Sequence, residues 1–167
     1  GNRYVIEIMR RMYHELNGEV GFYLSGGLTS EMKFELDNLK IIIPYYSPGV
    51  TSWIQNLAFI KSCNLCLSPT LIENFSNAFV EAFSLSKPIV TFDVGGNKEI
   101  VDDGLNGYIV PYLDVDQLVN KACSLLRDVE RLKSFSQEAK RKAQEFSDIE
   151  RLKLQYSLLF NKVLNNK

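Results

Sequence analysis

The sequence contains little histidine, cysteine, proline or tryptophan, and it has no long apolar run. Its 167 residues include one histidine, three cysteines, five prolines and one tryptophan. An odd number of cysteines does not suit a disulfide framework, and so few ligating side chains argue against a four-ligand zinc site. No apolar segment approaches the roughly 20 residues that cross a bilayer. These absences exclude a disulfide-rich secreted domain and a membrane-spanning helix.

Charge of either sign is not in excess, because 19 basic residues face 20 acidic ones, a net charge of -1. Nothing in this balance attracts nucleic acid, and we expect no nucleic-acid partner. With 46% hydrophobic and 23% charged residues, the chain has the composition of a folded protein. We expect residues 1–167 to form one domain of a soluble, cytoplasmic protein. Residues 127–167 hold ten basic and six acidic residues, which fits either a peripheral position at the inner face of a membrane or a solvated helix face.

Short β-prone runs alternate with longer stretches of helical spacing. The expected strands cover residues 20–24, 40–43, 64–68, 88–92 and 108–110. Runs such as 41–43 are apolar at successive positions, which is typical of a parallel sheet covered on both faces. The alternation predicts an α/β fold with a doubly wound, parallel, Rossmann-like sheet.

Helices are expected before, between and after these strands. The chain opens with helical spacing where a Rossmann-type sheet opens with a strand, so we expect the first strand to be missing. Ser52 and Gln55 predict a capping box for a second helix, and Ser76 or Asn77 are N-cap candidates for a third. Three helical patterns follow the last strand. The first begins at Asp114, and the last begins with an expected capping box of Ser147 and Glu150.

Ligands of open parallel sheets bind beyond the carboxyl ends of the strands, so the residues after each strand carry the most information. Residues 69–77 follow the strand at 64–68 and lead into the third expected helix. Glu73 lies before the start of this helix, and Glu81 lies about one turn inside it. The free amides of Ser76, Asn77 and Ala78 at the positive end of the helix dipole are suited to a phosphate. Two ordinary surface glutamates are the alternative interpretation.

This stretch carries a family resemblance. Residues 67–83, with Glu73 and Glu81 eight apart, resemble the E-x7-E segment of GT-B glycosyltransferases of the retaining family GT4. Residues 87–101 (KPIVTFDVGGNKEIV) and 102–111 (DDGLNGYIVP) are similar to two further segments of that family, in the same order and spacing. The close match covers roughly residues 64–116. The chain is thereby identified as resembling the C-terminal, donor-binding half of such an enzyme, with the acceptor domain absent.

The resemblance implies a role for each matched residue. Glu73 would be the catalytic-site acid that contacts hydroxyls of the transferred sugar, and Glu81 would bind the nucleotide ribose. Pro44, Tyr45 and Tyr46 would lie near the base, or form part of a core. The remaining donor-binding positions are the backbone amides of Phe75, Ser76, Asn77 and Ala78, which would contact the diphosphate, and the close-approach loop of Gly95 and Gly96. An ordinary tight turn is the alternative interpretation for the glycine pair.

The implied reaction is transfer of a sugar from a nucleoside-diphosphate sugar to an acceptor alcohol, with retention at the anomeric carbon. The acceptor would be a carbohydrate or a lipid-linked molecule, and neither a cofactor nor a metal would be required. Two alternatives stay open, a non-catalytic partner subunit of GT-B fold and a sugar-nucleotide epimerase. The epimerase would need acid-base histidines, and His14 is the only histidine.

Other motifs favour structural roles. Asp114-Val115-Asp116 spells a metal-binding D-x-D, but its position predicts a helix cap. Cys63 and Cys66 have C-x-x-C spacing and are interpreted as buried structural residues. Trp53 is interpreted as a helix-packing residue.

Overall fold

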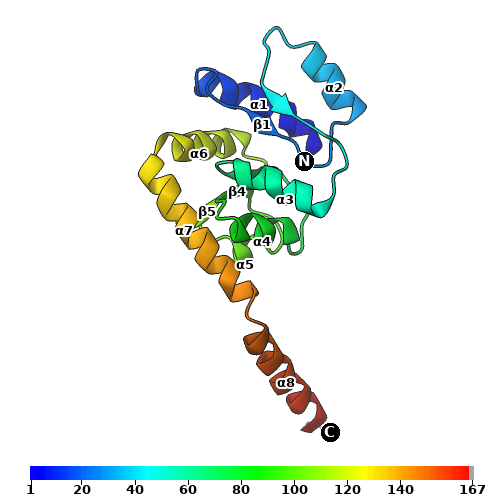
Figure 1. Ribbon diagram of the computed structural model, residues 1–167, viewed down its shortest axis with the longest axis vertical. Coiled ribbons are helices and arrows are strands. Elements are labelled where there is room, and N and C mark those ends of the chain that lie inside the picture. The colour runs from blue at the N-terminus through cyan, green and yellow to red at the C-terminus, as the bar shows by residue number, and fades with distance from the viewer. Residues whose placement is uncertain (166–167) are drawn as a thin grey trace.

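The structure, a computed structural model, describes residues 1–165, which form five short strands and eight helices. The strands are β1 (Phe22–Tyr23), β2 (Tyr45–Tyr46), β3 (Cys66–Ser68), β4 (Ile89–Phe92) and β5 (Gly107–Val110). The helices are α1 (Asn2–Glu15), α2 (Ser30–Asp37), α3 (Trp53–Ser62), α4 (Asn77–Ser84), α5 (Asn97–Ile100), α6 (Val115–Arg127), α7 (Val129–Phe146) and α8 (Ile149–Asn165). Figure 1 shows their order along the chain.

All strand pairs are parallel, as the apolar runs predicted. Strands β3, β4 and β5 form one sheet in sequence order, and β1 pairs with β2 in a second sheet. The α/β class with parallel sheets is confirmed, but the strands do not form one continuous sheet. Strands β1 and β3 each pair along one edge only, and residues of both line a cavity of about 1180 Å³. A missing first strand stays a prediction.

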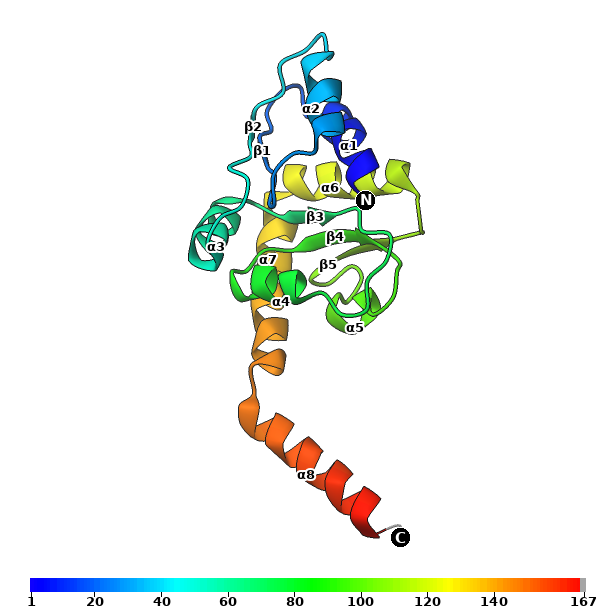
Figure 2. The same ribbon diagram turned by 90° about the vertical axis from the view of Figure 1, so that its right-hand side faces the viewer.

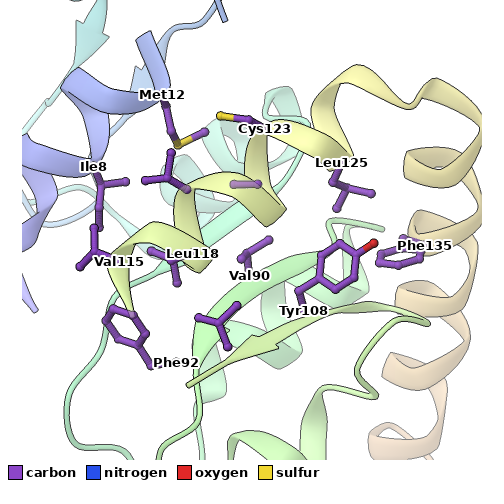
Figure 3. Close-up of a cluster of buried hydrophobic side chains, with 13 residues drawn as sticks. Ile8, Met12, Val90, Phe92, Tyr108, Val115, Leu118, Cys123, Leu125 and Phe135 are labelled. Carbon is purple, nitrogen blue, oxygen red and sulfur yellow. The ribbon is translucent and has the colours of Figure 1, made fainter. Parts of the chain in front are cut away.

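Helices cover both faces of the three-stranded sheet. Val90 and Phe92 of β4 point to one face, where they pack with Leu118 of α6. Figure 3 shows this cluster beneath α6, and Figure 2 shows α6 and α4 on opposite sides of the sheet. On the other face Ile89 packs with Phe83 of α4. Every residue of β4 is buried, which is typical of a parallel strand covered on both faces. Its one polar side chain, Thr91, donates to the Ser68 carbonyl at 3.0 Å.

The strand expected at residues 40–43 is wrong, because pairing with β1 begins only at Pro44. The carbonyl of Pro44 accepts the Phe22 amide at 2.9 Å, and β2 follows directly after it. In the run before Pro44, Ile42 is 91% exposed, whereas Ile43 is buried against α1 and α2. Periodicity alone did not separate an apolar loop from a short strand.

Helix starts were predicted with mixed success. The Ser52 capping box is confirmed, with the Ser52 amide 3.0 Å from Gln55 Oε1. Asp114 caps α6, because its carboxylate accepts the Gln117 amide at 2.8 Å. The expected box at Ser147 is wrong: Ser147 ends α7, and Asp148 caps α8 by accepting the Arg151 amide at 2.9 Å. The cap is therefore one position later than expected, at another residue type that is common at N-caps.

Helix α2 was not predicted from the sequence. Thr29 caps it by accepting the amide of Met32, and Met32 is its one buried residue. Its apolar side chains do not share one face, since Phe34 is 70% exposed. A helix with so little burial leaves almost no periodic signal.

Helix α8 extends away from the rest of the chain (Figures 1 and 2). Its apolar side chains are all exposed. These are Ile149, Leu152, Leu154, Tyr156, Leu158, Leu159, Phe160, Val163 and Leu164. Within residues 1–165 no helix combines the length and apolar character that crossing a bilayer requires.

All three cysteines are free thiols, and Cys63 and Cys66 are partly buried rather than fully buried as expected. Cys63 ends α3 and its thiol donates to the Phe59 carbonyl. Burial raises the pKa of Cys66 from 9.0 to about 12, so its thiol stays protonated at neutral pH.

Candidate functional site

The two predicted glutamates lie on either side of one helix start. Glu73 sits in the loop between β3 and α4, and Glu81 sits in α4 itself. Both side chains are partly exposed. The loop follows the carboxyl end of β3, which is the edge of a parallel sheet where ligands bind. Glu73 therefore lies at the expected end of the sheet, and Glu81 lies in the middle of α4.

The start of α4 offers free backbone donors. Ser76 is the N-cap, but its side chain makes no capping hydrogen bond. Its carbonyl accepts the Phe79 amide at 3.0 Å, whereas the predicted donor amides of Phe75, Ser76, Asn77 and Ala78 have no acceptor among residues 1–165. Unpaired amides at the positive end of a helix dipole bind anions. No side chain in the described part of the chain accepts a hydrogen bond from these amides.

The Glu73 loop is held by the glycine loop that follows β4. A Cβ added at Gly95 would lie 1.5 Å from the Glu73 carbonyl oxygen, and one at Gly96 would lie 2.0 Å from that of Asn74. Gly95 also has a positive φ of 47°, which L side chains rarely adopt. The two glycines thus let the backbones of the two loops touch. Their contact is with the loop that carries Glu73, and a direct contact with a donor stays a prediction.

Buried Asn97 holds the end of the glycine loop against β4, a role that the sequence did not suggest. Its Nδ2 donates to Thr91 Oγ1 at 3.1 Å and to the Phe92 carbonyl at 3.0 Å. Its Oδ1 has no partner among the described residues. Asn97 therefore ties the start of α5 to the end of β4. The sequence gives no signal for this, because an asparagine after Gly-Gly also suits a turn.

The Glu73 side chain turns back on its own loop. Its Oε1 accepts the Asn74 amide at 3.1 Å. No Lys or Arg in residues 1–165 pairs with Glu73 or with Glu81. A carboxylate without a basic partner retains acceptor positions for hydroxyl groups of a ligand.

Glu81 has a partner that the sequence did not suggest. The indole N–H of Trp53, 28 residues earlier, donates to Glu81 Oε1 at 2.8 Å. Trp53 is 63% exposed, so its interpretation as a helix-packing residue is wrong. Ser52 caps α3 and makes Trp53 the first residue of that helix, beside α4. Only the tertiary contact between the two helices reveals the pair.

Some of the predicted residues share one cavity and others do not. Glu73, Ser76 and Ala78 line the cavity of about 1180 Å³, together with Tyr46 and Gly27. Tyr46 also stacks with Tyr23, with ring centroids 6.4 Å apart. The predicted residues that do not line this cavity are Phe75, Asn77, Glu81, Gly95 and Gly96.

Phe75 points its side chain elsewhere. Its ring packs edge-on against Phe146 at the end of α7, with centroids 5.6 Å apart. Only the backbone of Phe75 therefore belongs to the loop that faces the proposed ligand.

In the described part of the chain, no three His, Cys, Asp or Glu side chains are close enough together to hold a metal ion. In the D-x-D sequence, Asp114 caps α6 and Asp116 pairs with Arg11 of α1. Both acids thus have structural partners.

Comparison with known proteins identifies the family. The sequence profile described as "Glycosyl transferases group 1" matches residues 1–128. The chain belongs to this family. It is 32% identical over 124 residues to the poly(glycerol-phosphate) alpha-glucosyltransferase of Bacillus subtilis (strain 168), which covers 74% of this chain and 18% of that protein. It is 30% identical over 99 residues to an uncharacterized glycosyltransferase of Methanocaldococcus jannaschii, covering 59% of this chain and 28% of that one.

Solved structures show the same fold. TarM of S. aureus, determined with alpha-GlcNAc-glycerol and UDP, superposes with a TM-score of 0.79 at 18% identity, over 95% of this chain and 32% of TarM. The C-terminal domain of the group 1 protein LpcC from Francisella tularensis superposes with a TM-score of 0.71 at 15% identity, over 86% of this chain and 79% of that domain. The architecture is that of the C-terminal domain of a GT-B glycosyltransferase. The chain spans less than a third of the curated relatives named above.

Proposed function

We propose that this chain is the donor-binding domain of a retaining glycosyltransferase of family GT4, which takes a nucleoside-diphosphate sugar as its substrate. The observation that carries the proposal is the start of α4, where free amides lie between Glu73 and Glu81. Family membership supports it, as does the presence of UDP in the structures of TarM and of Anabaena HepE.

The diphosphate would bind at the amides of Asn77 and Ala78, which the helix dipole makes attractive to negative charge. Glu73 would accept hydrogen bonds from hydroxyls of the sugar, and Glu81 from hydroxyls of the ribose. In this arrangement the leaving group lies at the positive end of α4. The amides would stabilise the diphosphate most strongly as it gains charge on departure, because their positions are fixed before the reaction begins.

In the proposed reaction, the bond between the anomeric carbon and the diphosphate oxygen breaks. A bond to the acceptor oxygen forms on the same face of the sugar, and the proton of the acceptor hydroxyl leaves with the nucleoside diphosphate. Glu73 orients the sugar during this exchange. The acceptor alcohol, a carbohydrate or a lipid-linked molecule, would be supplied by an acceptor domain.

Calorimetric titration with UDP-, GDP- and ADP-sugars tests the donor site. We expect saturable binding of at least one of them. Glu81→Ala should lower the affinity for that nucleotide-sugar and for its nucleoside diphosphate about tenfold or more. The reason is that a hydrogen bond to a charged group contributes about 1.5–3 kcal/mol. Glu73→Ala should lower the affinity for the nucleotide-sugar and leave the affinity for the nucleoside diphosphate unchanged.

Glu130→Ala is the matched control, because Glu130 is an exposed glutamate in the first turn of α7. It should bind like the unmodified protein. The absence of saturable binding to every nucleotide-sugar would contradict the proposal. Binding without sugar transfer, in a protein that carries the acceptor domain, would favour the non-catalytic partner subunit.

A further inference from the structure

We propose that Trp53 is a positioning residue that orients the Glu81 carboxylate toward the ribose of the bound nucleotide. The inference rests on the proposed function, because it assigns a determinant of nucleoside recognition within that site. It concerns a residue outside the segment that carries the family resemblance.

The contact joins two helices that are distant in sequence. Trp53 Nε1 lies 2.8 Å from Glu81 Oε1, and 28 residues separate the two side chains. No other hydrogen bond or ion pair engages the Glu81 carboxylate within residues 1–165. One oxygen is therefore occupied by the indole, and the second is left to accept hydrogen bonds from a ligand.

The position of Trp53 is fixed by the start of α3. Ser52 and Gln55 form a reciprocal capping box, so the first residue of α3 has a defined backbone conformation. An indole has only two rotatable side-chain bonds, whereas a free glutamate side chain has three and loses more conformational entropy when it is ordered. A rigid donor next to a flexible acid reduces the cost of ordering that acid for binding.

Burial does not explain why a tryptophan occupies this position. Its side chain is 63% exposed, and it belongs to none of the buried apolar clusters of the described chain. Exposing so large an apolar side chain gives up the free energy that its burial would contribute. The hydrogen bond to Glu81 is its one polar contact among the described residues.

The chemistry of the donor matters as well as its place. The indole N–H is a neutral donor, so it orients the carboxylate without neutralising it. A lysine or arginine at this position would form an ion pair and would compete for both oxygens. A carboxylate that keeps its full charge is a stronger acceptor for the two vicinal hydroxyls of a ribose.

The test compares a nucleoside diphosphate with its 2′,3′-dideoxy analogue, which lacks both ribose hydroxyls. UDP, GDP and ADP are titrated calorimetrically, and the one that binds is used with its analogue. Trp53→Phe keeps an aromatic ring but removes the N–H. We expect this variant to bind the nucleotide about fivefold more weakly, the effect of one hydrogen bond, and to bind the dideoxy analogue as the unmodified protein does.

In a Glu81→Ala background, Trp53→Phe should have no further effect on the affinity for the nucleotide. Equal losses for the nucleotide and its analogue, or no loss for either, would overturn the inference. If UDP, GDP and ADP all fail to bind the unmodified protein, the proposed function itself fails and the role of Trp53 fails with it. Tyr156→Phe is the control, because it changes an exposed aromatic residue of α8.

A second readout follows from composition, because Trp53 is the only tryptophan of the chain. Its intrinsic fluorescence reports on this one position. We expect a saturable change in emission during the nucleotide titration, with a midpoint that matches the calorimetric dissociation constant. An emission spectrum that is unchanged at saturating nucleotide would contradict a position beside the ribose.

Discussion

The three-stranded and two-stranded halves of the chain differ in how completely their sheets are covered. All four residues of β4 are buried, whereas both residues of β2 are exposed. Helices α4 and α6 cover opposite faces of the three-stranded sheet, and the two-stranded sheet borders the large cavity. The proposed acids and free amides stand on the packed half. Trp53, at the start of α3, contacts one of these acids, Glu81, and is itself 63% exposed.

The largest expected effect is on the packed half. Phe83 of α4 is 0% exposed, and Phe83→Ala should lower the free energy of unfolding by about 3–5 kcal/mol, since it removes buried apolar surface and leaves a cavity. Met32, which is 6% exposed, lies in the smaller cluster between α1 and α2. Met32→Ala should cost about 2 kcal/mol, because a small cluster beside a cavity can collapse around the change. Urea unfolding measures both values.

Phe34→Ala is the control for this pair, because Phe34 is 70% exposed, and it should change stability by less than about 0.5 kcal/mol. Phe83→Leu keeps most of the side chain and should remain folded if the alanine variant does not. Equal losses for Phe83→Ala and Met32→Ala would show that the two halves are packed equally well. The claim that the three-stranded half is the better packed one would then be wrong.

A smaller effect is expected where the packed half supports the site. Gly95→Ala would press a Cβ onto the Glu73 carbonyl and must displace that loop. We expect the affinity for the nucleotide-sugar to fall about tenfold, close to 1.4 kcal/mol. Gly104→Ala is the matched control, because Gly104 also has a positive φ, 77°, but its Cβ would meet open space.

Gly104→Ala should lose some stability from backbone strain while it binds donor normally. Calorimetric titration of both variants distinguishes the two effects. Unchanged donor affinity in Gly95→Ala would show that the contact between the glycine loop and the Glu73 loop does not support the site.

The sequence predicted the strands of the three-stranded sheet well and the region of the two-stranded sheet and α2 poorly. The strands expected at residues 88–92 and 108–110 are mostly apolar, and all their strand residues except the half-buried Ile109 are buried, so composition and structure agree. Residues 40–43 are as apolar but form no strand, because apolar composition does not specify where pairing with β1 begins. Helix α2 escaped prediction because burial of Met32 alone leaves no periodic pattern.

The same difference holds for the candidate site. The order of strand, loop and helix along the chain pointed to the segment with Glu73, Glu81 and the free amides, and the family resemblance, not the spacing, assigned their roles. Their tertiary partners were not, because the hydrogen bond from Trp53 and the contact of Gly95 with Glu73 join segments that are distant in sequence. Single-sequence patterns report neighbours along the chain, whereas these contacts depend on how helices and loops pack.

The most direct measurement is a crystal structure of the protein with the nucleotide-sugar that binds in the calorimetric panel. The account predicts the diphosphate within hydrogen-bond distance of the Asn77 and Ala78 amides, the sugar against Glu73 and the ribose against Glu81. A nucleotide bound away from the start of α4, or bound there with both acids turned away from it, would contradict the account.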